Sequence, residues 1–160
     1  MMHVRIIAVG KVKEKYLQEG IMEYAKRLRP YLDLQILEIN EEKRPASVSA
    51  SIEKSVMEKE GGRILAAIPP GSFTIALDIN GTDWSSRILA ESFRKWELAG
   101  KNQITFIIGG DLGLDKEVLS QSDMRLSLSN MTFTHPMARF LLLEQVYRVC
   151  RINSGEPYHK

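Results

Sequence analysis

The sequence has 160 residues, 44% of them hydrophobic and 26% charged, which is the composition of a soluble globular domain. Lysine and arginine exceed aspartate and glutamate by 22 to 20, so the net charge of +2 is weak evidence for a nucleic-acid partner. No apolar run approaches the roughly 20 residues that span a bilayer, and the first residues lack the pattern of a signal peptide. We therefore expect one cytoplasmic domain over residues 1–160, with no membrane partner.

Cysteine and histidine are too sparse to suggest a metal site. Cys150 is the only cysteine, which excludes a disulfide framework and a cysteine-based zinc site. It lies in an apolar segment with helical spacing, where we expect a buried, inert thiol. The three histidines are too far apart in the chain to have the spacing of metal ligands. We therefore expect no metal.

Strand patterns and helix patterns alternate along the chain. In order, they predict a strand over 4–9, a helix over 17–28, a strand over 32–39, a helix over 52–65, a strand over 73–79, a helix over 85–100, a strand over 104–108, a helix near 116–120, a strand near 124–128 and a helix over 136–151. Ser47 or Ser49, and later Ser85, are suitable helix N-caps, whereas Gly61 and Gly62 weaken the second helix. This alternation predicts an α/β fold, a parallel sheet with helices on both faces.

The last predicted helix is apolar nearly all the way round. Such a helix must be buried on several sides, and the sheet covers only one of them. We therefore expect a second subunit to cover another side, which makes the protein a homodimer.

Glycines gather late in the chain instead of after the first strand. The first strand is followed by a single glycine, so the fingerprint of a dinucleotide-binding domain is absent, and no phosphate-binding P-loop occurs. Gly109, Gly110 and Gly113 follow the most apolar strand, where they permit a ligand to approach the backbone or simply make a tight connection. With the loop over 128–133, they offer backbone groups that suit an adenine or a ribose. Leu77 is either an apolar wall of this site or a core leucine.

With these residues identified, the chain resembles the RlmH (YbeA-like) group of the SPOUT methyltransferases over essentially its whole length. The motifs that carry the resemblance are Ile7-Ala8-Val9-Gly10-Lys11, Glu23-Tyr24-Ala25-Lys26-Arg27-Leu28, Ile107-Ile108-Gly109-Gly110, Gly113-Leu114 and Leu126-Ser127-Leu128-Ser129. The most specific ones are Met131-Thr132-Phe133 with His135, Glu144-Gln145-Val146-Tyr147-Arg148 and Pro157-Tyr158-His159-Lys160.

The resemblance implies a SPOUT-type α/β fold with a deep trefoil knot at its C-terminus, an exception to the rule that chains do not thread loops. It also implies an antiparallel or perpendicular homodimer that holds S-adenosylmethionine in the knot. By matching position, the cofactor contacts would be Leu77, Gly109, Leu128, Ser129, Asn130, Met131, Thr132 and Phe133. One position departs from the family, because Pro136 stands where a glutamine commonly follows the motif histidine. Any contact made by that glutamine side chain is lost here.

The implied reaction is methylation of N3 of a pseudouridine, nucleotide 1915 of 23S ribosomal RNA. The imide nitrogen carries a proton at neutral pH, so that proton must be removed or accepted. His159 is one candidate base, and Lys160 could instead stabilise the anion electrostatically. Tyr158 could stack on the target base. The alternative for these catalytic candidates is an ordered tail that only packs on its partner.

Arg139 and Arg148 on the last helix are candidates for RNA phosphate contacts, with salt bridges at a subunit interface as the alternative. Because so short a chain leaves no room for a separate RNA-binding domain, we expect the substrate to be the assembled ribosome or its large subunit. Two rival interpretations remain at this point. One is a ribosome-binding protein without chemistry, and the other is a SPOUT enzyme that acts on transfer RNA.

Overall fold

The computed structural model describes residues 1–160 and contains one five-stranded parallel sheet with the strand order β2-β1-β4-β3-β5. The strands are β1 (Met2–Val9), β2 (Leu32–Ile39), β3 (Phe73–Asp83), β4 (Gln103–Ile108) and β5 (Met124–Ser127). The helices are α1 (Lys15–Leu28), α2 (Ala50–Ala67), α3 (Ser86–Leu98), α4 (Lys116–Gln121) and α5 (His135–Asn153). The predicted alternation of strands and helices is confirmed.

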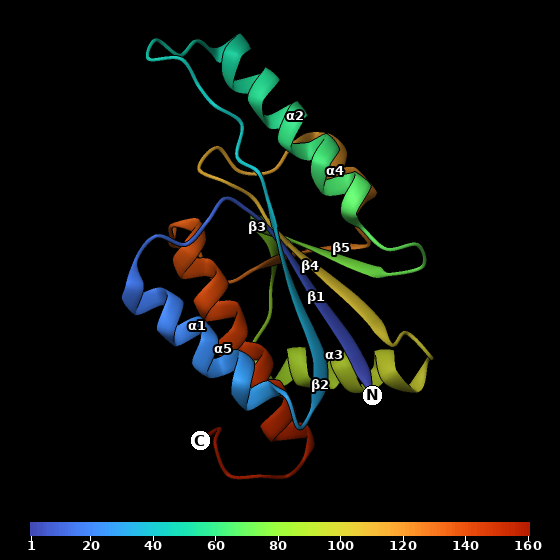
Figure 1. Cartoon of the computed structure of the whole chain (residues 1–160). Helices are drawn as coiled ribbons and strands as arrows, with labels where there is room; N and C mark the ends of the chain where they lie inside the picture. Colours follow the sequence, from blue (N-terminus) through green and yellow to red (C-terminus); the bar gives the residue numbers. More distant parts are fainter.

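Helices cover both faces of the sheet, as the sequence predicts (Figure 1). Successive side chains of a strand point to opposite faces, and β1 is apolar on both. Val4 and Ile6 face the larger core with α1, α3 and α5, whereas Ile7 and Val9 face a smaller core with residues of α2 and α4. All four side chains are at most 1% exposed. Strands that are buried on both faces explain the near-continuous apolar runs of the sequence.

Helix α5 lies between α1 and α3 and packs against β1 and β4. Leu142, Leu143 and Val146 are fully buried there. On the α1 side, the ring of Phe140 lies so close to Gly20 that a Cβ at the glycine would be 2.5 Å from it. The expectation that a second subunit must cover this helix rested on the sheet being its only cover. That premise was wrong, because two helices of the same chain flank it.

Local signals place most element boundaries correctly. The hydroxyls of Ser49 and Ser85 accept hydrogen bonds from backbone N–H groups of the first turns of α2 and α3, so both are N-caps. Helix α2 continues through Gly61, where a Cβ would lie 3.0 Å from the Cβ of Asp115 before α4. Close approach of the two segments therefore accounts for that glycine. Strand β3 continues past residue 79 to Asp83, with a register shift in its pairing to β5.

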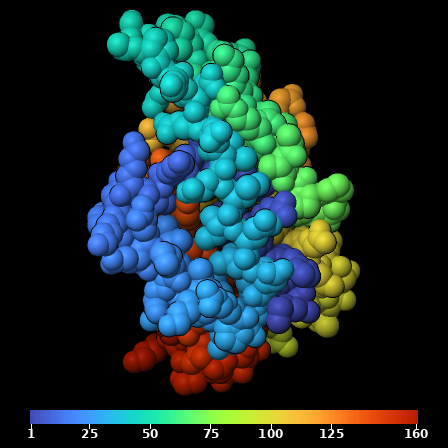
Figure 2. All heavy atoms as spheres, in the orientation of Figure 1, coloured from blue at the N-terminus to red at the C-terminus, as the bar shows by residue number.

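The start of α2 and the C-terminal tail lie at opposite ends of the molecule. Figure 2 shows the start of α2 projecting at one end and the C-terminal residues gathered at the other. The α1–β2 connection lies beside that tail, since the hydroxyl of Tyr31 donates a hydrogen bond of 2.7 Å to Glu156. None of the helices has the length and apolar character needed to cross a membrane.

Candidate active site

A pocket lies at the carboxyl ends of β4 and β5 and beside Leu77–Ile79 of β3, just after the pairing of β3 with β4 ends at Ala76. Ligands of open α/β folds bind at this edge of a parallel sheet. The wall of the pocket is mostly apolar, with backbone groups between the apolar side chains. The lining residues are Leu77, Asp78, Ile79, Ile108, Gly109, Gly110, Gly113, Leu114, Leu128, Ser129, Met131, Thr132, Phe133, His135 and Ala138. An apolar cleft with a few polar groups is typical of sites for small organic ligands.

The turn after β4 requires glycine for two different reasons. Gly113 has φ +86°, a left-handed conformation that other residues rarely adopt. Its N–H donates a 3.0 Å hydrogen bond to the carbonyl of Gly110, which closes the turn. A Cβ on Gly109 would lie 2.8 Å from the backbone carbon and oxygen of Gly113. The turn therefore brings bare backbone to the pocket wall.

Two serines hold the loop that follows β5. The hydroxyl of Ser127 donates to the carbonyl of Ser129 at 3.0 Å, and the hydroxyl of Ser129 accepts from the N–H of Met131 at 3.0 Å. These local bonds fix the path of the backbone from Leu128 to Phe133 along the pocket. The side chains of Met131 and Phe133 are 75% and 39% exposed at its rim.

The structure brings together most of the residues expected to contact the cofactor. Leu77 reaches the pocket because β3 lies between β4 and β5, an order that the sequence did not reveal. Asn130 is the exception, since it is exposed and does not line the pocket.

His135 is a pocket residue to which the sequence analysis gave no role. It begins α5, directly after the loop, and its side chain is 15% exposed. Nε2 lies 3.8 Å from the carboxylate of Asp111, which pairs with Arg44 at 3.2 Å. Nδ1 is buried and has no hydrogen-bond partner. Its place was signalled by the motif that it shares with Met131-Thr132-Phe133, next to the predicted loop.

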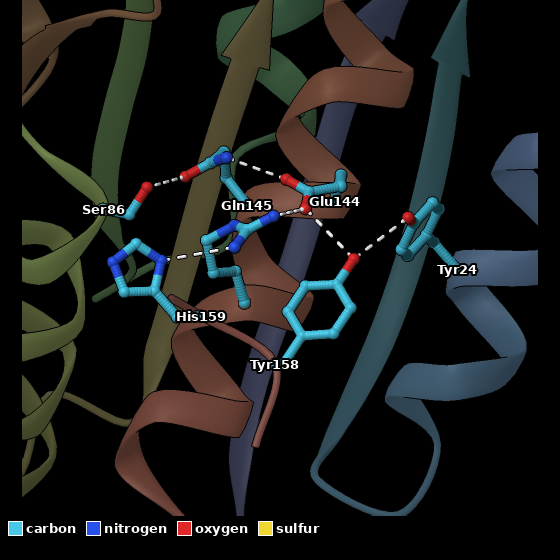
Figure 3. A network of polar contacts seen from close by, with 7 residues as sticks. Tyr24, Ser86, Glu144, Gln145, Tyr158 and His159 are labelled. Atoms are coloured by element: carbon cyan, nitrogen blue, oxygen red, sulfur yellow. Dashed lines mark hydrogen bonds and ion pairs between the residues drawn. The ribbon is translucent and has the colours of Figure 1, made fainter. Parts of the chain in front are cut away.

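The C-terminal tail lies on α5 and not in the pocket of the same chain (Figure 3). The hydroxyl of Tyr158 donates to Glu144 at 3.1 Å and lies 3.2 Å from the hydroxyl of Tyr24. Burial, together with these two partners, raises the pKa of Tyr158 well above its usual value, so the phenol stays protonated. His159 lies 3.2 Å from Arg148. Lys160 is exposed at the end of the chain.

The separation between tail and pocket follows from the length of α5. Ala138 lines the pocket, and Arg148 holds the tail ten residues later. At 1.5 Å per residue this is about 15 Å along the helix axis. Tyr158 and His159 therefore do not reach the pocket of their own chain while they hold these contacts.

Arg139 has a structural role in this chain instead of the expected RNA contact. Its side chain is 3% exposed, and its guanidinium binds Glu38 at 2.7 Å and the carbonyl of Gly10 at 3.2 Å. A guanidinium so enclosed is not available to a phosphate. Arg148 is paired with Glu144, and its side chain is 23% exposed.

No group of three or more histidine, cysteine, aspartate or glutamate side chains is placed to hold a metal ion.

Comparison with protein families identifies the fold and its chemistry. A family described as "predicted SPOUT methyltransferase" matches residues 2–159. The chain belongs to the SPOUT methyltransferase family. The pocket that β3 lines with the loops after β4 and β5 is therefore the candidate methyl-donor site of a methyltransferase.

Full-length relatives agree with this assignment. The chain is 61% identical over 159 residues to a relative from Methanoregula boonei, covering 99% of this chain and 100% of the relative. It is 50% identical to "Ribosomal RNA large subunit methyltransferase H" of Carboxydothermus hydrogenoformans over 99% of this chain and 100% of that one. In fold, it is similar to the solved structure of a methylase family protein from Haemophilus influenzae, with a TM-score of 0.52, 16% identity and coverage of 98% of this chain and 70% of that one.

Proposed function

We propose that this SPOUT methyltransferase uses S-adenosylmethionine to methylate N3 of pseudouridine 1915 of 23S ribosomal RNA in the assembled ribosome or large subunit. The single observation that carries the proposal is the pocket that Gly109 shares with Leu77 and Leu128. Relatives named as large-subunit ribosomal RNA methyltransferases support the substrate. We place the protein in the cytoplasm, where such substrates are.

The pocket fits the chemical parts of the methyl donor. Leu77, Leu128 and Phe133 offer apolar contacts suited to an adenine ring, and the Gly109 turn offers backbone groups suited to its polar edge. The bound donor would supply a methyl group that is already activated on a sulfonium. The protein then has mainly to position the two reactants, which requires no metal.

A second copy of the chain is needed to complete the site in this account. Tyr158, His159 and Lys160 lie far along α5 from the pocket of their own chain. We propose that two copies pack through the exposed side of α1 and α5 in an orientation that brings the tail of one to the pocket of the other. Tyr16 and Met22 on α1 are 68% and 70% exposed, and such large apolar side chains suit a subunit interface. In the family this dimer accompanies the trefoil knot, which we propose here as well.

The direct test of the substrate is mass mapping of 23S ribosomal RNA from cells with and without the gene. We expect one methyl group to disappear from the fragment that contains the target pseudouridine. An unchanged fragment, or loss of methylation on transfer RNA instead, would contradict the proposal.

Purified ribosomes should also be methylated faster than protein-free RNA, because the assembled particle supplies contacts that an isolated RNA lacks.

Deletion of Tyr158–Lys160 separates methyl transfer from donor binding. We expect methylation to be lost while calorimetry gives nearly the same affinity for S-adenosylmethionine, because every residue that lines the pocket is kept and the deleted tail is assigned to the target base. Full activity of the truncated protein would remove the tail from the site.

A further inference from the structure

The C-terminal tail is held by a continuous polar network on α5 (Figure 3). Ser86 of α3 donates to Gln145, and Gln145 donates to one oxygen of Glu144 at 2.8 Å. The other oxygen of Glu144 accepts from Arg148 and from Tyr158. The Glu144 carboxylate thus has partners on both oxygens, and it fixes the Arg148 guanidinium in place.

Arg148 binds both aromatic residues of the tail. Its guanidinium carbon lies 4.7 Å from the centre of the Tyr158 ring, which is the geometry of a cation–π contact. Its Nη1 lies 3.2 Å from Nδ1 of His159. One arginine therefore sets the position of the tyrosine and the orientation of the imidazole.

The contact with Arg148 decides which nitrogen of His159 carries the proton. A guanidinium has only N–H donors, so the nitrogen that faces it must accept with a lone pair. The imidazole is then neutral, and its single N–H lies at Nε2, which points away from the network in Figure 3. An imidazolium, or the other tautomer, would direct an N–H at the guanidinium.

We infer that Arg148, held by Glu144, fixes His159 as the neutral Nε2–H tautomer, so that His159 donates a hydrogen bond to the target base instead of accepting its proton. The inference rests on the proposed function, since the base is the pyrimidine methylated there. Arg148 and Glu144 are positioning residues, and His159 is the group that touches the substrate.

The chemistry of N3 methylation suits such a donor. When N3 loses its proton to a water molecule or hydroxide of the solvent, negative charge spreads to the neighbouring carbonyl oxygens. A hydrogen bond from His159 Nε2 to one of these oxygens stabilises that anion. The N3 lone pair then bonds to the methyl carbon, and the electron pair of the broken carbon–sulfur bond stays on sulfur. Tyr158 does not take the proton, because its own hydroxyl is committed to Glu144.

Nitrogen-15 NMR of the full-length dimer tests the tautomer without any activity measurement. Two-bond correlation spectra distinguish the two neutral tautomers and the imidazolium, and the H159Q variant identifies the His159 signals among those of the three histidines. We expect the Nε2–H pattern in the wild type and in the control R87M, and a changed pattern in R148M. An Nδ1–H or doubly protonated ring at neutral pH in the wild type would overturn the inference.

Two substitutions of His159 test its role in methyl transfer to ribosomes. Glutamine places an N–H donor near the position of Nε2 but cannot act as a base, whereas alanine removes both functions. We expect H159A to lower kcat at least about 100-fold, the loss typical when one anion-stabilising donor is removed. We expect H159Q, which keeps a donor, to stay within about tenfold of the wild type. Equal loss in both variants would overturn the inference. Absence of methylation by the wild type would instead refute the proposed function and leave the NMR result standing.

Discussion

At the scale of single residues, two arginines of α5 have different surroundings although they look alike in the sequence. Arg139 is enclosed by Glu38 and the Gly10 carbonyl, and its Nε is buried without a partner. Arg148 faces the tail. The sequence could not separate them, because Glu38 lies 101 positions before Arg139 and is brought there only by the tertiary fold. Residue type and helical spacing reveal a cation but not its partner.

Replacing Arg139 should therefore affect stability and not RNA binding. The R139M variant leaves a carboxylate and a carbonyl without their donor, and we expect a loss of about 2–4 kcal/mol in the free energy of unfolding by urea. The matched control is R87M, since Arg87 is exposed, and it should change stability by no more than about 0.5 kcal/mol. An R139M protein of wild-type stability whose ribosome affinity has become less salt-dependent would contradict this role.

Cys150 is half-buried and not fully buried as expected, and we predict from its apolar surroundings that its thiol is unreactive. Burial, with a smaller contribution from Glu97, raises the pKa of its thiol to about 12. At pH 8 the reactive thiolate is then rarer by a factor of about 1,000 than in an unperturbed cysteine. We expect the native protein to react with a disulfide reagent at least about 100-fold more slowly than the protein unfolded in guanidinium chloride. Fast labelling of the native protein would show that the thiol is accessible and contradict this.

At the scale of elements, the sequence predicts nearly every strand and helix, because periodicity and capping residues act locally. The Ser49 and Ser85 caps are examples, since each bond joins residues three apart. The extension of β3 was missed because its pairing with β5 depends on a strand that comes later in the chain. Helix α2 runs unbroken through Gly61 and Gly62, which weakened the prediction of that helix. Helix propensity, a local property, does not reveal that α4 packs close to Gly61.

The neighbouring glycines of α2 give a matched pair of substitutions. A Cβ on Gly62 meets no atom within 4 Å, whereas one on Gly61 lies 3.0 Å from Asp115 and 3.3 Å from Val118. We expect G62A to stabilise the protein by about 0.5–1 kcal/mol, as glycine-to-alanine changes in helices do. G61A should be less stable than G62A by at least about 1 kcal/mol, because the methyl group crowds α4. Equal unfolding midpoints in urea for the two variants would contradict this packing.

At the scale of the whole molecule, the pocket depends on the order of the strands. The sequence predicts the loops after β4 and β5, but only the sheet topology shows that β3 separates them and brings Leu77 to their shared edge. Strand order is set by long-range pairing, which no local pattern records. The fold class was therefore predictable, whereas the assembly of the site from β3 and the ends of β4 and β5 was not. The position of the tail followed from the resemblance alone, and the structure places it about 15 Å along α5 from the pocket.

The central claim of this account is that one subunit's pocket works with the partner's tail. Complementation between two inactive variants tests it most directly. G109A disturbs the pocket, because its Cβ would lie 2.8 Å from the backbone of Gly113, and deletion of Tyr158–Lys160 removes the tail. The two chains are co-expressed with different tags, and the mixed dimer is purified through both. It contains one intact pocket facing one intact tail, so we expect about half of the wild-type rate of ribosome methylation, while each variant alone is inactive. An inactive mixed dimer that still binds S-adenosylmethionine would contradict the claim.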